Sequence, residues 1–248
     1  MGRIEQNTDM ANVADTAVVT GSSGIGLALS RMLVKNGYEV FGFGRNFERA
    51  EAQEFCKEQP EKFHAVVCDI TDTQALCAHI KEIDKNYRVT VLVNNAGVGY
   101  YGLHEELNPK KIQKMVRTNL EAPMILTQQL LRTLKKNRGT VLNISSVTAA
   151  QSNPHGCAYG ATKAGLSGFA KSLFDEVRKY GVRVITIQPD MAKTDLYRNA
   201  DFCEGEEEAS YLLPEEVAEA AAFALAQREG LVVTEITVKP QFHRIRRK

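Results

Sequence analysis

The sequence lacks the features that mark several large classes of protein. It has no tryptophan, and its five cysteines include no Cys-x-x-Cys pair, so neither a disulfide framework nor a cysteine-based zinc site is expected. Lysine and arginine (31) almost balance aspartate and glutamate (30), for a net charge of +1. We therefore expect no nucleic-acid or membrane partner. No apolar run reaches the length of a signal-peptide core or a membrane span, which predicts a cytoplasmic protein.

The 248 residues do contain a regular alternation of strand and helix patterns. Short β-branched runs predict strands at residues 16–20, 38–43, 63–68, 90–93, 140–144, 182–188 and 231–238. Apolar periodicity and helix start and stop signals predict helices at residues 25–36, 47–59, 73–86, 109–118, 121–135, 159–180 and 214–227. This alternation predicts an α/β fold, a doubly wound parallel sheet of about seven strands with helices on both faces, which is a Rossmann fold in a single domain.

Three segments lie outside the alternation. Residues 1–14 are polar and unpatterned and predict a flexible tail, and residues 241–248 predict a frayed, basic tail. Residues 191–213 have no periodicity, and we expect them to form a substrate lid whose acidic run, residues 204–208, is solvated. Residues 15–240 are then one dinucleotide-binding and catalytic domain.

The loops that follow the first three predicted strands carry residues suited to a dinucleotide. The first loop is glycine-rich and opens a helix, where backbone amides bind pyrophosphate; its candidate residues are Gly21, Ser23, Gly24, Ile25 and Gly26. Arg45 follows the second strand, where an NAD-selective fold carries an acid, so its guanidinium indicates the 2′-phosphate of NADP; an ordinary surface arginine is the alternative. After the third strand, Asp69 and Ile70 can contact adenine, although a helix cap formed by Asp69 or Thr71 is an equally good interpretation.

The next loops continue this pattern. Asn95, Ala96 and Gly97 follow the fourth strand, where small residues allow close approach to the cofactor and asparagine side chains can bridge neighbouring strands. Pro189 and then Thr194 follow the sixth strand. Because ligands of a doubly wound sheet bind beyond the carboxyl ends of its strands, we expect these loops to form one cofactor site.

A tyrosine and a lysine lie four residues apart in a predicted helix. Tyr159 and Lys163 then share one face of that helix. A cation beside a phenol stabilises the phenolate, so we expect Lys163 to lower the pKa of Tyr159 from about 10 towards neutrality. Ser146 could hold a substrate oxygen beside this pair. Taken alone, the spacing is common by chance, and a solvated helix face is the alternative.

Taken together, these residues resemble the short-chain dehydrogenase/reductase family over about residues 16–238. The resemblance rests on Asn94–Gly97 followed by Asn119, Ser146, Tyr159 and Lys163, which are 27, 13 and 4 residues apart. It implies that Tyr159 is the catalytic acid/base, that Ser146 orients the substrate oxygen and that Lys163 holds the nicotinamide ribose. It further implies that Asn119 anchors a proton-relay water and that Thr194 binds the nicotinamide carboxamide. It also implies a homodimer or homotetramer.

Two positions depart from the pattern of the family. Gly21 and Gly24 are separated by two residues, whereas the family has three, so the glycine loop is one residue short. Asp190 follows Pro189 where the family has glycine, and its carboxylate would either repel the pyrophosphate or face solvent.

The function that the resemblance predicts is hydride transfer between NADP(H) and a small-molecule carbonyl/alcohol pair, with no metal required. NAD(H) is the less favoured cofactor. Two alternatives stay open: an NAD-dependent alcohol or hydroxy-acid dehydrogenase, and a non-catalytic NADP-sensing regulatory module. Candidates for lining the substrate site are Gln151, His155, Tyr197 and Phe202.

Overall fold

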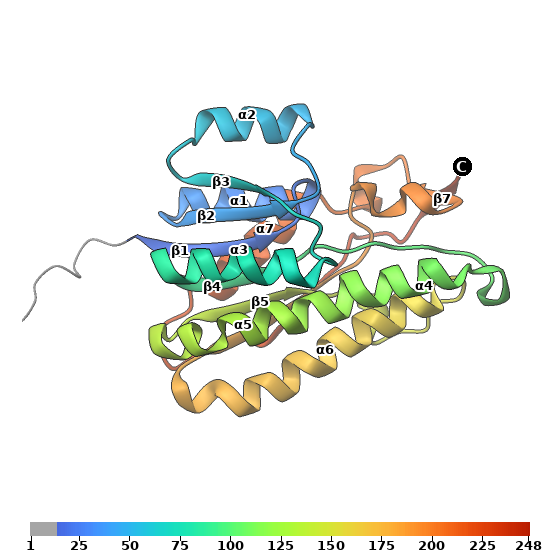
Figure 1. Ribbon diagram of the computed structural model, residues 1–248. Coiled ribbons are helices and arrows are strands. Elements are labelled where there is room, and N and C mark those ends of the chain that lie inside the picture. The colour runs from blue at the N-terminus through green and yellow to red at the C-terminus, as the bar shows by residue number, and fades with distance from the viewer. Residues whose placement is uncertain (1–13) are drawn as a thin grey trace, which may run out of the picture.

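A seven-stranded parallel sheet forms the centre of the computed structural model, which describes residues 14–248 (Figure 1). Its strand order is β3-β2-β1-β4-β5-β6-β8. The strands are β1 (Asp15–Thr20), β2 (Glu39–Gly44), β3 (Phe63–Val67), β4 (Arg88–Asn94), β5 (Thr140–Ile144), β6 (Arg183–Pro189) and β8 (Glu235–Val238). The predicted doubly wound sheet of about seven strands is therefore confirmed, and the order reverses between β1 and β4.

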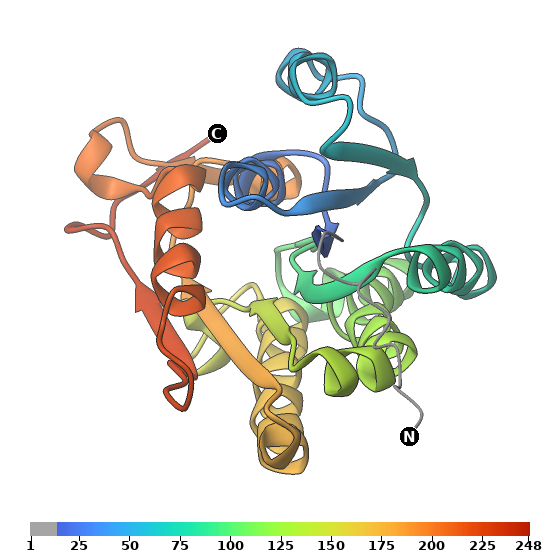
Figure 2. The same ribbon diagram turned by 90° about the vertical axis from the view of Figure 1, so that its left-hand side faces the viewer.

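Helices cover both faces of the sheet, as Figure 2 shows in a view along the layers. One face carries α1 (Gly24–Lys35), α2 (Ala50–Glu58) and α7 (Pro214–Leu225), and the other α3 (Thr73–Asn86), α5 (Ala122–Asn137) and α6 (Cys157–Val177). Side chains alternate along a strand, so Val19 of β1 packs into the first apolar layer and Val18 into the second. Because both are fully buried, the central strands read as continuous apolar runs.

The break predicted near Asn119 is a wider helical turn instead. Helix α4 (Pro109–Val116) passes into a π-helical segment, Arg117–Glu121, which continues directly as α5. Such segments have one extra residue in a turn and often occur at functional sites. The chain therefore turns Asn119 into the interior without ending the helix, and Asn119 is buried.

The frayed C-terminal tail predicted from composition is wrong. Strand β9 (Ile245–Arg247) pairs antiparallel with β7 (Phe202–Glu204) inside the segment expected to be the lid. Arg244 and Arg246 also form ion pairs with the acidic run, at 2.6 Å from Glu207 and 3.1 Å from Glu206. Opposite charges far apart in the sequence thus meet, so the acidic run is paired rather than only solvated.

The predicted flexible N-terminal tail lies outside the described residues, apart from residue 14. Over residues 14–248, none of the helices combines the length and the apolar character that crossing a bilayer would require.

Candidate active site

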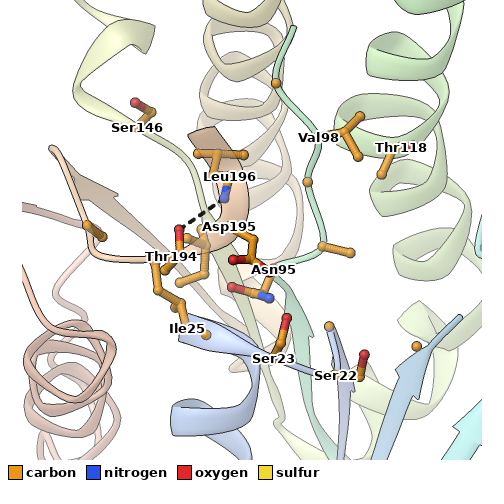
Figure 3. A pocket seen from close by; sticks show the side chains of 18 of the residues that line it. Ser22, Ser23, Ile25, Asn95, Val98, Thr118, Ser146, Thr194, Asp195 and Leu196 are labelled. Atoms are coloured by element: carbon orange, nitrogen blue, oxygen red, sulfur yellow. Dashed lines mark hydrogen bonds between the residues drawn. The ribbon is translucent and has the colours of Figure 1, made fainter. Parts of the chain in front are cut away.

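A pocket opens at the carboxyl ends of β1 and β4, where the strand order reverses. This is the position at which a doubly wound sheet binds its ligands. Figure 3 shows the pocket, with Ser22 and Ser23 of the glycine loop, Asn95 of the loop after β4 and Ser146 after β5 around it. All the catalytic and cofactor-binding residues predicted for the site line this pocket except Gly26 and Asn119, which lie behind it.

Although it is one residue short, the glycine loop still places the N-terminus of α1 at the pocket. Gly21 has a φ of +120° and donates its N–H to the carbonyl of Phe43 at 2.7 Å. Gly24 has a φ of +51° and is the first residue of α1. The first amides of a helix have no intrahelical acceptor, so they are available to an anion. Gly26 packs under this loop, since a Cβ there would lie 2.7 Å from the carbonyl oxygen of Gly21.

Asparagine side chains tie the central strands together below the pocket. Asn95 donates from Nδ2 to the carbonyl of Thr20 at 2.8 Å, and the Thr20 hydroxyl accepts from the Asn95 and Ala96 amides at 3.0 Å. Asn94 donates to the side chain of Asn143 at 2.9 Å. The expected bridging role of these asparagines is thus present, and it fixes the loop after β4 against β1.

Positive groups surround Asp69 at the other end of the pocket. Burial raises the pKa of Asp69, but hydrogen bonds from Thr71 and the charges of Arg45 and Lys114 outweigh this effect, so the pKa lies below its usual value. Asp72, rather than Asp69 or Thr71, caps α3. Lys114 lines the pocket beside Arg45 and was missed from the sequence, where it reads as one more exposed lysine of an amphipathic helix.

Tyr159 and Lys163 lie together on α6, both almost fully buried. The Lys163 Nζ lies 5.8 Å from the centre of the Tyr159 ring and donates to the carbonyl of Ile144 at 2.7 Å. This carbonyl ends β5, so the hydrogen bond fixes the lysine against the sheet edge. The pair is therefore part of the pocket wall rather than a solvated helix face.

Burial dominates the pKa values of this pair. It raises the pKa of Tyr159 to about 12, although a hydrogen bond with Ser146 opposes the rise. It also lowers the pKa of Lys163 to about 8. The predicted lowering of the tyrosine pKa by the lysine is therefore wrong for the chain by itself, because transfer of both groups from water disfavours both charged forms.

The two serines after β5 have different partners. The Ser145 hydroxyl donates to the carbonyl of Lys163 at 3.1 Å and lies 2.8 Å from the Ser167 hydroxyl, so it joins β5 to α6. The Ser146 oxygen accepts from the N–H and the hydroxyl of Thr148, at 3.2 and 3.0 Å. The Ser146 hydroxyl proton points to Tyr159, with which Ser146 forms the hydrogen bond that opposes the rise in the tyrosine pKa. Ser146 is thus the better placed of the two to contact a substrate oxygen.

Asn119 lies behind the pocket, where its side chain is fully used. It accepts from the Val98 N–H at 2.8 Å and donates to the Val98 carbonyl at 2.9 Å and to the Thr162 hydroxyl at 3.1 Å. Gly97 separates it from Lys163, since a Cβ there would lie 3.5 Å from Asn119 Oδ1 and 3.6 Å from Lys163 Nζ. Asn119 therefore fixes the loop that passes Lys163.

The segment after β6 folds over the glycine loop. The Thr194 hydroxyl accepts from the Leu196 N–H at 3.3 Å. Its methyl group lies against Gly24, because a Cβ added to Gly24 would be 3.0 Å from that methyl carbon. Figure 3 shows Thr194 and Asp195 beside Ile25 and Asn95. Asp195 also forms an ion pair with Arg49, at the start of α2. The segment is therefore held against the cofactor end of the pocket.

The carboxylate of Asp190 has partners of its own. It accepts from the Met191 N–H at 2.9 Å and lies 3.7 Å from His243. Its side chain is 15% exposed. Asp190, which stands where the family has glycine, is thus paired within the chain instead of facing open solvent.

An aromatic wall of Tyr101, Tyr197 and Phe202 stands over Tyr159. The Tyr101 ring centre lies 5.7 Å from that of Tyr159, 6.0 Å from that of Tyr197 and 5.2 Å from that of Phe202. Burial raises the pKa of both wall tyrosines, so they are neutral. Two of the four candidates named from the sequence belong to this wall, whereas Gln151 and His155 are exposed outside it. Tyr101 was missed, although it lies only four residues after Gly97.

Comparison with known proteins gives the family. Residues 15–202 match the family model described as short chain dehydrogenase. The chain is 38% identical over 186 residues to serine 3-dehydrogenase of Agrobacterium fabrum, covering 74% of each protein. It is 34% identical over 233 residues to a 3-oxoacyl-[acyl-carrier-protein] reductase of Rickettsia conorii, covering 90% of this chain and 93% of that one.

Solved structures agree with these relatives. An alcohol dehydrogenase of Thermococcus sibiricus complexed with 5-hydroxy-NADP has a TM-score of 0.83 at 27% identity, covering 93% of this chain and 98% of that one. Actinorhodin polyketide ketoreductase with NADPH has a TM-score of 0.81 at 28% identity, covering 93% and 97%. With the family model matched over most of the chain, this protein belongs to the short-chain dehydrogenase/reductase family of oxidoreductases.

Proposed function

We propose that the protein interconverts a small-molecule carbonyl and an alcohol, with NADP(H) as the hydride carrier and Tyr159 as the acid/base. The observation that carries the proposal is the grouping of Ser146, Tyr159 and Lys163 in one pocket with the open N-terminus of α1. An anion-binding helix end and a proton donor are the two parts that this reaction requires.

The residues of the pocket fit such a cofactor. Gly21, Gly24 and Gly26 leave space that side chains would fill, which lets the backbone approach a pyrophosphate. Thr194 lies against Gly24 of this loop, which supports its proposed role in holding the nicotinamide amide. When bound, the nicotinamide supplies or accepts the hydride; all other steps belong to the side chains.

Arg45 and Lys114 support a preference for NADP(H) over NAD(H). Both line the end of the pocket that contains Asp69, and both act on the pKa of that carboxyl group. A guanidinium binds a phosphate with two parallel hydrogen bonds, and a nearby ammonium adds a second positive charge. The structural neighbours complexed with NADPH or 5-hydroxy-NADP agree with this preference.

The proton chemistry follows from the environment of Tyr159. A pKa of about 12 keeps the phenol protonated at neutral pH, so it is ready to donate to a carbonyl oxygen. The Ser146 hydroxyl donates a second hydrogen bond to the same oxygen and stabilises its developing charge. This state suits reduction of the carbonyl. The reverse reaction needs the phenolate, and we therefore expect alcohol oxidation to become faster as the pH rises.

Residues 191–213 are proposed as the substrate lid, since they carry Thr194 and two residues of the aromatic wall. All five cysteines are free, which is consistent with the reducing cytoplasm as the location. The proposal includes a homodimer or homotetramer, in keeping with the family resemblance, and light scattering after gel filtration tests it.

The function is tested by removing one oxygen atom from the side chain of Tyr159. Purified protein should oxidise NADPH, followed at 340 nm, in the presence of ketones or aldehydes. Tyr159→Phe removes the proton donor and keeps the buried ring, so we expect kcat to fall by at least about a hundredfold, the usual contribution of general acid catalysis. Tyr180→Phe, at an exposed tyrosine just after α6, is the control and should keep full activity. Turnover by Tyr159→Phe at the wild-type rate would rule out the role of the tyrosine.

A further inference from the structure

The C-terminal residues 242–248, here called the C-terminal strap, are bonded along the lid. Strand β9 pairs with β7 over three consecutive residues. Beyond this ladder, Gly205 donates to the Arg244 carbonyl at 3.1 Å, Phe242 to the Ala209 carbonyl at 2.9 Å and Lys248 to the Asp201 carbonyl at 2.8 Å. The strap therefore follows the lid from residue 201 to residue 209 through main-chain hydrogen bonds.

Charged side chains add to this pairing. The Arg244–Glu207 and Arg246–Glu206 ion pairs join the strap to the lid. All four side chains are more than half exposed, so salt screens these ion pairs and each contributes little alone. Their geometry nevertheless fixes the register of two short strands that have no other neighbour in the described part of the chain.

The strap contacts two residues of the aromatic wall. Lys248 donates from Nζ to the main-chain carbonyl of Tyr197 at 2.6 Å. Phe202 is the first residue of β7 and pairs directly with Arg247. His243 lies 3.7 Å from Asp190, at the edge of the pocket. The main chains of two of the three aromatic wall residues are thus held by the strap, that of Phe202 through strand pairing and that of Tyr197 through the Lys248 side chain.

The surroundings of the wall are apolar on the side of Tyr159, and the charges near the Tyr197 phenol are acidic. Tyr159 packs with Val98, Met115 and Leu196 as well as Tyr101. The charged groups that act on the wall residue Tyr197 are Asp190 and Glu204, and both raise its pKa. A substrate carboxylate placed here would face two negative charges. An uncharged, flat group can stack on the rings without this repulsion.

We propose that the C-terminal strap is part of the substrate site: it positions the wall of Tyr101, Tyr197 and Phe202, and the wall selects an uncharged aryl group next to the carbonyl. The selectivity part of this proposal rests on the proposed carbonyl reduction. The strap residues do not touch the reacting atoms and are positioning residues.

The test compares two diketones that differ by one ring. With NADPH, 1-phenylpropane-1,2-dione presents a phenyl group and butane-2,3-dione a methyl group beside the same reacting carbonyls. The wild-type protein should prefer the phenyl compound in kcat/KM by roughly tenfold or more, since a well-packed apolar group gives discrimination of this size. Equal use of the two diketones by the wild-type protein would overturn the selectivity of the wall.

Charge reversal in the full-length chain tests the strap. The double variant Arg244→Glu and Arg246→Glu places acids against the acidic run, and we expect the phenyl preference to fall about fivefold through a higher KM. Adding Glu206→Arg and Glu207→Arg restores attraction and should restore the preference. Arg178→Glu is the control; Arg178 lies just after α6, and this change breaks its exposed ion pair with Asp175. A preference that the double variant leaves unchanged overturns the role of the strap.

A second readout does not depend on activity. Removal of residues 242–248 should speed hydrogen exchange of the peptide spanning residues 195–213, while exchange in β1 and β4 stays slow. Unchanged exchange in the lid overturns the strap even if the enzyme is active. If the wild-type protein oxidises NADPH with neither diketone nor any other carbonyl, the proposed function is overturned, and the selectivity with it. The exchange result still decides whether the strap holds the lid.

Discussion

Replacement of Lys163 by methionine should abolish turnover and make the protein more stable. Lys163 is buried, and burial lowers its pKa from 10.5 to about 8. One pKa unit corresponds to about 1.4 kcal/mol, so the charged lysine costs the folded state about 3 kcal/mol at neutral pH. Methionine has a similar length and no charge. It forfeits the hydrogen bond to the Ile144 carbonyl, a loss of about 1 kcal/mol.

The net expectation at pH 7 is a gain of about 2 kcal/mol in the free energy of unfolding. For a domain of this size that gain raises Tm by roughly 4–8 °C. Urea unfolding followed by circular dichroism measures it. Lys171→Met, at an exposed lysine of the same helix that pairs with Glu235, is the matched control and should change stability by less than about 0.5 kcal/mol.

The pH dependence distinguishes this cause from simple repacking. Below about pH 8 both folded and unfolded Lys163 are protonated, and the whole penalty is present. Between about pH 8 and 10.5 the unfolded chain still binds the proton that the folded chain has released, so the wild-type protein gains stability as the pH rises. The advantage of methionine should shrink over this range and then reverse. A variant that is less stable than wild type at pH 7, or whose advantage is the same at pH 7 and 10, would refute the reasoning.

Three further substitutions test other parts of the site. Arg45→Ala should raise KM for NADPH about tenfold and that for NADH less than twofold, because only NADPH carries the 2′-phosphate; equal increases would contradict this role. Asn119→Ala leaves a buried main-chain N–H at Val98 without its acceptor and should lower the free energy of unfolding by about 2 kcal/mol in urea. Gly26→Ala should weaken NADPH binding at least about tenfold in a fluorescence titration, since its Cβ would lie 2.7 Å from a glycine-loop carbonyl. Gly168→Ala, in open space on α6, should bind NADPH normally.

Much of the fold could be predicted because its signals are local. Apolar strands followed by periodic helices determine a parallel sheet with covered faces, and α3 and β5 have the predicted bounds. The pocket could be placed because the carboxyl ends of parallel strands meet at one edge. Loops as distant as those holding Gly21 and Tyr159 therefore line one cavity. Their grouping follows from the topology and requires no knowledge of individual contacts.

The sequence by itself determined the sheet, the position of the pocket and the identity of most of its polar residues, because each depends on a pattern within one segment or on the order of segments. Tertiary structure alone decided the pKa values of Tyr159 and Lys163, because these depend on how much water the surrounding helices and strands exclude. It also decided that Tyr101 joins the aromatic wall and that the basic C-terminus binds the acidic lid. Such contacts join residues that lie far apart in the sequence, as Tyr101 and Phe202 or Lys248 and Tyr197 do, and they leave no local pattern in it.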